Sequence, residues 1–305
     1  MILAAAVTAS EAWDGPLPTW REIYKSFGVA PPGPDLPADA ANAKTKIHFI
    51  DVGQADAVLL EQDGVFALID AGDTAAAAGL VAYLEGAGVK RLALVVMTHP
   101  HTDHIGGMQA VLEAFPVELL VLPNLGAAQM PTNPVADGLL RAVRDKGIPA
   151  ATAVAGKSYA LGGGTVTVLC TGVGAQDGDD ALNDRSVVTL FEAPGVRYLA
   201  TGDGEKAEEQ ALLLSGADVR ADLFKAGHHG SYTSNSDDLL MEVYPRYVVV
   251  SCGADNPYGH PHNSALRAFR DAGAEIYRTD RDGTVVAYVN EQQKLRIAVQ
   301  NREAA

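Results

Sequence analysis

The stretch VVMTHPHTDHIGG, residues 95–107, decides how the rest of the sequence is interpreted. An apolar run ends there, and three histidines and an aspartate follow within six positions: His99, His101, Asp103 and His104. In layered α/β folds, ligands bind where strands end. We therefore expect a buried strand that delivers a cluster of polar side chains to a functional site.

The spacing within this cluster suits a metal-binding loop. His99 and His101 are two residues apart, so an extended loop can point both imidazoles the same way. Asp103 and His104 follow after a turn and can face a second point nearby. Imidazole and carboxylate ligands suit zinc, manganese or iron. The alternative is a loop entering a helix, with Asp103 as its N-cap; four potential ligands in six positions favour a metal.

Composition sets limits on the function. With 305 residues, of which 48% are apolar and 20% charged, the chain can bury a substantial core. Lys and Arg number 23 against 38 Asp and Glu, and the net charge of −15 disfavours a protein that mainly grips nucleic-acid backbones. A nuclease stays open, because divalent cations and local basic residues could offset this charge at a site. Cys170 and Cys252 each end an apolar run and are expected to be small buried residues without a disulfide.

The chain divides into an extension and one domain. Residues 1–43 predict an N-terminal extension: an apolar, signal-like start over 1–10 without the usual basic beginning, a short helix within 16–29, and a proline-rich extended linker over 30–40. Export and a cytoplasmic location both stay open. Residues 44–305 contain no long linker and are expected to form a single domain, and no apolar run is long enough to span a bilayer.

Within this domain, hairpin-linked strands mixed with single crossover helices predict two mixed β-sheets with helices on their outer faces. Strands are predicted over 46–52, 56–62, 65–70, 91–97, 117–123, 165–170, 185–193, 196–202, 221–226, 246–253, 275–279, 283–290 and 294–300. Helices are predicted over 74–88, 107–115, 134–147, 205–216, 236–244 and 264–273.

Further polar residues follow later strands. Asp203, in YLATGDGE, lies in a glycine turn where a carboxylate could bridge two metals. FKAGHHGSYTS offers His228 and His229, and NPYGHPHNS offers His260 and His262 in a loop punctuated by proline. Each segment alone could be an ordinary loop. Beside the first cluster, they predict a metal-binding constellation.

The motif THPHTDHIGG resembles the HxHxDH signature of the metallo-β-lactamase fold hydrolases. IDVGQADAVLL, LNDRSVVTL, LATGDGEKAEEQALL, LFKAGHHGSYTS and NPYGHPH resemble the ComEC-type branch, the hydrolase domain attached to the DNA-uptake channel of competence systems. The resemblance spans roughly Lys46 to Asn290. It implies an α/β fold, an αββα four-layer sandwich of two mixed β-sheets, with a two-metal site between the sheet edges.

The resemblance also implies two divalent ions, zinc in the first place and manganese as the alternative. His99 with His101 is expected to bind one ion, and Asp103 with His104 the other. Asp203 is expected to bridge the two ions.

The resemblance also indicates which residues complete and support the two metal sites. One of His228 and His229 should complete the second site, and we expect His229. Asp70, in LIDAGD, matches an aspartate that orients metal-bound histidines. Many relatives supply a third histidine to the first metal, but no histidine stands between His104 and His228, and Asn183 matches an asparagine of the ComEC-type pattern. The first site is therefore expected to be open or weaker.

Two divalent ions lower the pKa of a shared water and neutralise charge on a phosphoryl oxygen. The sequence therefore predicts a metal-dependent phosphodiesterase or nuclease, with single-stranded DNA as a candidate substrate. Asp103, His228 and His260 are expected to take part in the reaction, with His228 or His260 donating a hydrogen bond or proton to the leaving oxygen. Supporting or substrate-binding roles are expected for Asp70, Asn183, Lys225, Ser231, Tyr232, Asn256 and His262.

Three alternatives are a phosphorylcholine esterase-like hydrolase of a surface polymer, a β-lactamase, and a binding module with a vestigial metal site. The missing third histidine disfavours a β-lactamase, and the intact ligand set disfavours the binding module. A nuclease should show a basic groove beside the metals, using Arg185, Lys225 or Arg278. A choline esterase should show an aromatic box built mainly from tyrosine.

Two departures from the ComEC-type pattern are visible. The chain reads GQAD where the branch has GQGD, from which we expect a mild backbone effect. The membrane channel of DNA-uptake proteins is missing from this sequence, so we expect a free-standing version. No protein partner is predicted.

Overall fold

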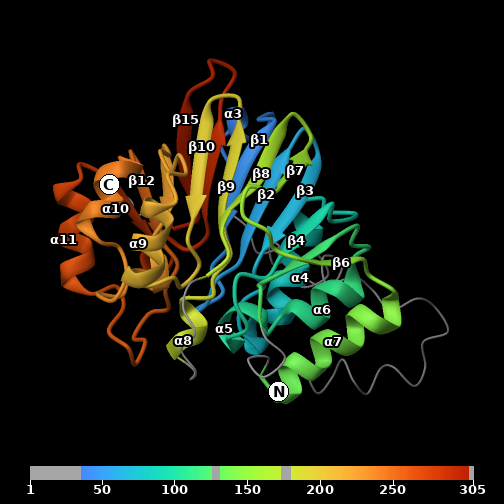
Figure 1. Cartoon of the computed structure of the whole chain (residues 1–305). Helices are drawn as coiled ribbons and strands as arrows, with labels where there is room; N and C mark the ends of the chain where they lie inside the picture. Colours follow the sequence, from blue (N-terminus) through green and yellow to red (C-terminus); the bar gives the residue numbers. More distant parts are fainter. Residues whose placement is uncertain (1–35, 126–130, 173–179, 302–305) are drawn as a thin grey trace.

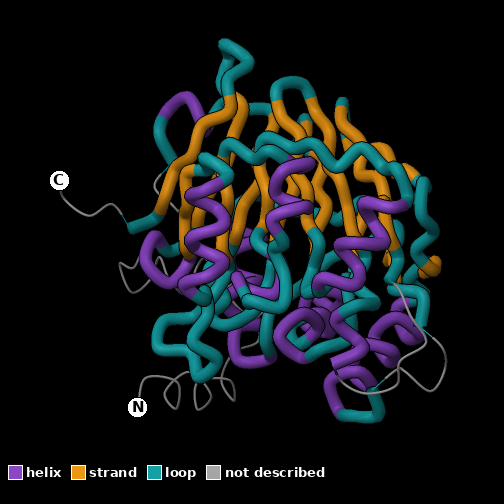
Figure 2. The backbone as a smooth tube through the Cα atoms, turned by 60° about the vertical axis from the view of Figure 1, so that its left-hand side comes forward, coloured by secondary structure: helices purple, strands orange, loops and turns teal. Residues whose placement is uncertain are grey.

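The structure, a computed structural model, describes residues 36–125, 131–172 and 180–301. Two β-sheets face each other, and helices cover the outer face of each sheet (Figures 1 and 2). The predicted αββα sandwich with two mixed sheets is therefore confirmed. The signal-like start and the helix predicted within 16–29 lie outside the described residues.

The first sheet contains strands from both ends of the described chain, in the order β15-β14-β1-β2-β3-β4-β5-β6. Its strands are β1 (Thr45–Phe49), β2 (Val58–Gln62), β3 (Val65–Ile69), β4 (Leu94–Val96), β5 (Leu120–Leu122), β6 (Ala150–Thr152), β14 (Val285–Val289) and β15 (Leu295–Val299). β15 through β3 pair antiparallel, and β3 through β6 pair parallel. Asp63 and Gly64 join β2 to β3 with φ angles of 52° and 76°, which a two-residue hairpin turn requires.

The second sheet has the order β13-β12-β11-β10-β9-β8-β7. Its strands are β7 (Ser158–Leu161), β8 (Gly164–Cys170), β9 (Val188–Ala193), β10 (Val196–Ala200), β11 (Leu223–Lys225), β12 (Tyr247–Val250) and β13 (Glu275–Arg278). β7 through β10 pair antiparallel, whereas β10 through β13 pair parallel. Both sheets therefore join an antiparallel part to a parallel part.

Helices alternate with these strands along the chain. The α-helices are α3 (Ala38–Ala41), α4 (Ala77–Gly86), α5 (Thr102–Ile105), α6 (Met108–Ala114), α7 (Pro134–Lys146), α8 (Asp180–Asn183), α9 (Lys206–Leu214), α10 (Asp237–Val243), α11 (Asn263–Asp271) and α12 (Thr279–Asp282). Two 3₁₀ turns, η2 (Thr74–Ala76) and η3 (Gly227–Gly230), are described as well. Every strand and helix predicted within 44–305 is present, most of them shorter than predicted.

Burial on both faces explains why the strands are almost continuously apolar. In β2, Val58 and Leu60 pack between the sheets, while Leu59 packs under α4 and α6. Between the sheets, the rings of Phe49 and Tyr198 meet edge to face with centroids 5.4 Å apart. A third core lies under α9, α10 and α11. These three cores hold the four layers together.

The sequence did not predict the short elements β6, β7, α3, α5, α8 and α12. β6 and β7 lie at sheet edges, where a strand needs little apolar character. Of the extended linker predicted over 30–40, residues 36–40 are described: Pro37 is extended as predicted, whereas the prediction is wrong from Ala38, because Ala38–Ala41 forms a helical turn in which Ala40 packs against Tyr288 and Ala298.

Two features bear on the cysteine and membrane predictions. Both cysteines are free, with Cys252 buried as predicted and Cys170 half-buried. Among the described residues, no helix has the length and apolar character needed to cross a membrane.

The functional region lies where parallel strands of both sheets end, near α5 and α8 (Figure 1). Asp70 follows β3, His99 follows β4, Asp203 follows β10, and His229 follows β11. Because parallel strands end at one edge, residues far apart in the sequence meet there.

Gly106 and Gly107 explain the end of the motif THPHTDHIGG. A Cβ atom on Gly106 would lie 2.2 Å from the backbone nitrogen of Thr74, and one on Gly107 would lie 2.3 Å from the carbonyl oxygen of Ala71. The backbone N–H of Ala71 donates to the carbonyl of His104 at 2.7 Å. The glycines thus allow the histidine-rich turn to lie directly on the loop that carries Asp70.

This packing predicts the effect of Gly107→Ala. The added methyl group collides with backbone, so we expect the free energy of unfolding to fall by about 1–3 kcal/mol in urea titrations. Gly79→Ala is the matched control, since Gly79 is an exposed residue of α4 where an added Cβ atom would have no neighbour within 4 Å. It should stabilise the protein by about 0.5–1 kcal/mol. Equal effects of the two substitutions would contradict the steric explanation.

Candidate metal centre

A cavity of about 680 Å³ opens at this edge of the sheets. Five histidines, three acidic residues and two tyrosines line it, and the remaining lining residues are Ser, Thr, Asn and Gln. Most small-molecule sites are lined mainly by apolar side chains. This cavity is therefore suited to a charged, polar group.

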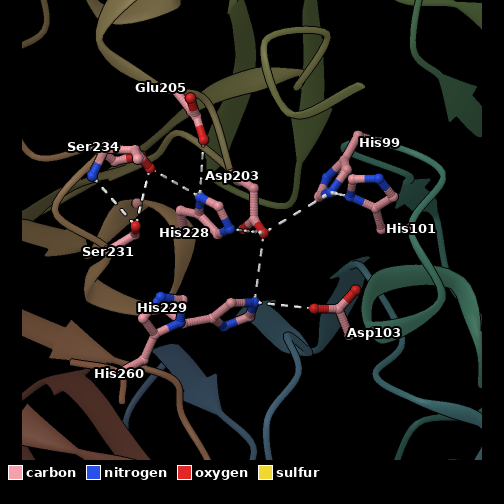
Figure 3. A network of polar contacts seen from close by, with 12 residues as sticks. His99, His101, Asp103, Asp203, Glu205, His228, His229, Ser231, Ser234 and His260 are labelled. Carbon is pink, nitrogen blue, oxygen red and sulfur yellow. Dashed lines mark hydrogen bonds and ion pairs between the residues drawn. The ribbon is translucent and has the colours of Figure 1, made fainter. Parts of the chain in front are cut away.

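The carboxylate of Asp203 lies at the centre of the histidines (Figure 3). Its Oδ2 atom is 3.2–3.9 Å from four imidazole Nε2 atoms, those of His104 (3.2 Å), His229 (3.5 Å), His228 (3.8 Å) and His99 (3.9 Å). Its backbone N–H donates to Ser186 Oγ at 3.0 Å. This hydrogen bond fixes the glycine turn that places the carboxylate.

The tautomers of two histidines follow from what their Nδ1 atoms contact. Nδ1 of His104 lies 2.7 Å from Asp70 Oδ2, and Nδ1 of His229 lies 3.0 Å from the carbonyl oxygen of Ser251. Both partners are acceptors, so each Nδ1 carries a proton and donates it. In the neutral ring, Nε2 then presents a lone pair toward Asp203.

His99 is oriented by a hydrogen-bond chain. Thr98 Oγ1 donates to Asp70 Oδ2 at 2.6 Å, which leaves its lone pairs to accept from His99 Nδ1 at 3.1 Å. His99 Nε2 is therefore an acceptor as well, and it lies 3.0 Å from Nδ1 of His101. Asp70 thus contacts His104 directly and reaches His99 through Thr98.

These residues fit a divalent cation. Asp103 Oδ2 lies 3.2 Å from His229 Nε2 and 3.9 Å from His104 Nε2. The buried atom Asp203 Oδ1 makes no hydrogen bond within the described part of the chain, and the partner of His104 Nε2 at 3.2 Å is another carboxylate oxygen, Asp203 Oδ2. Buried polar atoms without partners are rare, and imidazole nitrogen with carboxylate oxygen is a donor set that transition metals prefer. A metal at this point would satisfy Asp203 Oδ1 and His104 Nε2.

Asp56 is a residue that the sequence analysis missed. Together with His104, Asp203 and His229 it forms a buried group whose potential ligand atoms lie within 4.8 Å of one another. Its oxygens, however, face the Nδ1 atoms of His229 (3.6 Å) and His104 (3.8 Å), on the side away from Asp203. We therefore infer that Asp56 supports the two imidazoles from behind. The quoted motif GQAD was the signal that could have identified it.

Lys225, for which a supporting or substrate-binding role was expected, lies behind the cluster. It is only 2% exposed, does not line the cavity, and forms an ion pair with Asp56, Nζ to Oδ2 at 2.5 Å. Burial would lower the pKa of Lys225, but the carboxylate of Asp56 outweighs burial and raises it. Lys225 is a fixed positive charge at the back of the cluster.

The carboxylates dominate the electrostatics of the cluster. Burial alone would lower the pKa of His104, but Asp203 and Asp70 raise it well above its usual range. Burial also opposes a charge on His229, where Asp203 and Asp56 nonetheless raise the pKa to about 10. In the absence of a metal, both imidazoles therefore hold a second proton at neutral pH.

The hydrogen bonds of His260 define which of its nitrogens carries a proton. Gln54 Oε1 accepts from the backbone N–H of Gly253 at 3.0 Å, so its amide nitrogen faces His260 Nδ1 at 3.3 Å. An amide nitrogen can only donate, so Nδ1 accepts and Nε2 carries the proton. Burial, together with the neighbouring imidazoles of His229 and His228, lowers the pKa of His260 to about 4. His260 is therefore a neutral hydrogen-bond donor.

The other predicted residues at the cavity differ in what they contact. His228 Nδ1 lies 3.3 Å from Thr233 Oγ1 and 3.4 Å from Glu205 Oε1. Ser231 lines the cavity and exchanges a hydrogen bond with Thr233 at 2.9 Å. Asn183 also lines it, and its Oδ1 makes no hydrogen bond within the described residues.

Two predicted polar residues shape the loop after β12 and its surroundings. Asn256 does not line the cavity; its amide nitrogen donates to the carbonyls of Gly253 and His260, at 2.9 and 2.6 Å. Asn256 therefore positions the backbone of His260. His262 lines the cavity, and its Nδ1 accepts from the backbone N–H of Tyr232 at 3.2 Å.

The basic groove expected beside the metals is not found. None of the described residues lining the cavity is Lys or Arg. Arg278 is engaged by Asp280 through two hydrogen bonds, and Arg185 does not line the cavity. The basic side chains considered for a nuclease groove, Arg185, Lys225 and Arg278, therefore lie outside the cavity lining.

Residues 50–254 match the Metallo-beta-lactamase superfamily, and the chain belongs to this superfamily. It is 28% identical over 265 residues to ComE operon protein 3 of Bacillus subtilis and 32% identical over 237 residues to Competence protein ComA of Neisseria gonorrhoeae. These proteins are of the ComEC type, so the predicted resemblance is confirmed.

The two alignments cover 80% and 77% of this chain but 33% and 31% of the relatives, so the chain spans about a third of their length. Among solved structures, the chain is similar to Igni18, a metallo hydrolase from Ignicoccus hospitalis, with a TM-score of 0.51 and 18% sequence identity. That match covers 79% of this chain and 98% of Igni18, and it supports the fold alone.

The protonation of His104 and His229 makes metal binding depend on pH. A divalent cation at their Nε2 atoms must displace protons, so we expect Zn²⁺ affinity to rise between the ordinary histidine pKa of 6.5 and about 10. Calorimetry at neutral pH should give binding enthalpies that differ between buffers of different ionisation enthalpy. His229→Asn should reduce the number of protons released.

His48→Gln is the matched control for this measurement. His48 is a buried histidine beside Tyr83, and burial lowers its pKa, so it has no proton to release. Binding enthalpies that do not depend on the buffer would contradict the assignment of the cation to these imidazoles.

Proposed function

We propose that this protein is a metal-dependent phosphodiesterase. The observation that carries the proposal is the convergence of four imidazole Nε2 atoms on Asp203 at the floor of a cavity with an entirely polar and aromatic lining. A phosphodiester is an anionic group without apolar bulk at its reacting centre, and it suits such a lining. Membership of the Metallo-beta-lactamase superfamily supports hydrolysis as the reaction class.

The ligand assignment keeps the pattern that the resemblance implies. His99 and His101 would hold one divalent ion, zinc first and manganese as the alternative. The second ion would lie on His104, His229 and Asp103, with Asp203 between the two. His229 is preferred to His228 because its Nε2 atom also faces Asp103, at 3.2 Å. When bound, the ions supply the Lewis acidity that activates water and neutralises phosphoryl charge.

The residues of the chain then have separate tasks. Asp103, the most exposed carboxylate of the cluster, orients the attacking water. Water adds to phosphorus and gives a proton to Asp103, the bond to the leaving oxygen breaks while His260 Nε2–H donates a hydrogen bond to that oxygen, and the leaving oxygen then takes up the proton. His228 presents its Nε2 to Asp203, which makes His260 the better donor of the two.

Single-stranded DNA is a candidate substrate because one relative is named Competence protein ComA. No Lys or Arg of the described residues lines the cavity, so recognition would depend on the reacting phosphate and its substituents more than on a long phosphate backbone. A substrate panel of single-stranded DNA, bis(p-nitrophenyl) phosphate, p-nitrophenyl phosphorylcholine and a chromogenic β-lactam distinguishes the candidates.

The metal ligands should be essential. We expect His101→Ala and Asp203→Ala to lower phosphodiester turnover by at least about 100-fold and to reduce the metal content measured by atomic emission. Asp237→Ala, which removes an exposed carboxylate of α10, is the control and should retain both. Absence of turnover with Zn²⁺ and Mn²⁺ in the wild type, or its survival in both variants, would refute the proposal.

His260 can be tested without disturbing the metals. His260→Phe keeps a ring but removes the donor, so kcat should fall about 100-fold with unchanged metal content. His260→Gln retains a donor and should lose less. If the two variants lose the same activity, His260 does not act through its Nε2–H group.

A further inference from the structure

Two tyrosines at the cavity are exposed to an unusual degree. Tyr232 is 60% exposed and Tyr258 is 65% exposed, and both line the cavity above the metal cluster. Within the described part of the chain, neither hydroxyl makes a hydrogen bond. Large exposed aromatic side chains at the mouth of a polar site mark a binding surface.

The two tyrosines are the ends of a row of four rings. Tyr258 stacks on His260 with centroids 5.6 Å apart and an interplanar angle of 23°. His260 meets His262 at 4.9 Å, and His262 meets Tyr232 at 4.9 Å, both nearly perpendicular. We call Tyr258, His260, His262 and Tyr232 the aromatic row.

The aromatic row leads to the metal cluster. The ring of His260 also stacks on that of His229, with centroids 6.1 Å apart and an interplanar angle of 23°. The rings of Tyr258 and His260 therefore lie between the cluster and a group stacked on the outer face of Tyr258. A substituent of the reacting phosphate that extends past His260 would meet the row.

Backbone hydrogen bonds hold the row in place. The backbone N–H of His262 donates to the carbonyl of Gly230 at 3.0 Å, and that of Tyr232 donates to His262 Nδ1 at 3.2 Å. Asn256 holds the backbone of His260 from both sides. Fixing the rings before the ligand arrives lowers the entropic cost of binding.

We propose that the aromatic row is a stacking subsite for a planar aromatic group attached to the reacting phosphate, such as a nucleobase. The inference rests on the proposed function and names its substrate class: phosphodiesters that carry a flat ring. Base stacking on aromatic side chains needs no basic groove. This agrees with a cavity that lacks Lys and Arg among its described lining residues.

The geometry favours a flat ring over a quaternary ammonium group. An aromatic box for choline needs ring faces that converge on one cation. Tyr232 and Tyr258 contact different histidines and make no ring contact with each other in the described structure. A row of neighbouring rings presents successive surfaces, which suits stacking.

Three substrates with one leaving group test the subsite. They are the methyl esters of thymidine 5′-phosphate, of methyl phosphate and of phosphorylcholine, so that only the thymidine ester carries a flat ring, and methanol release is measured. For the thymidine ester, we expect Tyr258→Leu and Tyr232→Leu each to lower kcat/KM about 10-fold more than for dimethyl phosphate, mainly through KM. Tyr258→Phe keeps the ring and should retain the preference.

Tyr244→Leu is the matched control. Tyr244 is 66% exposed but does not line the cavity, so its replacement should leave all three rates unchanged. Equal losses of the tyrosine variants on all three esters would mean that they act through local structure, and a loss confined to the choline ester would mean an ammonium site. Either result overturns the stacking subsite.

Failure of the proposed function is recognised separately. If the wild type hydrolyses none of the esters, the phosphodiesterase proposal fails. The stacking subsite is then tested by calorimetry, which compares the affinity for thymidine 5′-monophosphate with the affinity for methyl phosphate. Preference for the thymidine compound that is lost in Tyr258→Leu supports the subsite, whereas equal binding of the two ligands overturns it.

Discussion

The structure depends on one electrostatic constraint: the carboxylate of Asp203 shares a buried space with other carboxylates. Asp56 and Asp70 are each no more than 2% exposed, and Asp103 adds a further negative charge. Buried charges of one sign are costly unless partners balance them. Lys225 supplies one fixed positive charge, and the imidazoles supply the rest either by holding protons or by sharing a cation. This excess of buried negative charge therefore favours the binding of a divalent cation.

The fold meets this constraint by giving each imidazole its own support. His104 and His99 are oriented through Asp70 and Thr98, while His229 is oriented by a backbone carbonyl after β12. Because the supports come from different strands, no single loop has to carry the whole site. The parallel strand ends bring the supports to one edge, and the close packing around the glycines of the HxHxDH motif keeps them there.

Much of this arrangement could be predicted from local patterns. The strands and helices followed from apolar periodicity, and ligand candidates such as His99 and Asp203 followed from polar residues directly behind strands. Edge strands and one-turn helices could not be predicted, because they bury too little apolar surface to leave a pattern. The sequence left two roles open for Lys225 for a related reason: its sequence neighbours resemble a strand end, whereas its charge partner, Asp56, comes from the other sheet.

The sequence by itself determined the fold class, the family and the residue types that gather at the site, since periodicity and motif spacing are properties of neighbouring residues. Only the tertiary structure decided which nitrogen of each histidine is free, that Lys225 is buried against Asp56, and that two exposed tyrosines join two histidines in one row. These features depend on contacts between segments that meet only when both sheets are assembled. Hydrogen bonds and ion pairs are short-range, so their partners are fixed by packing and not by position along the chain.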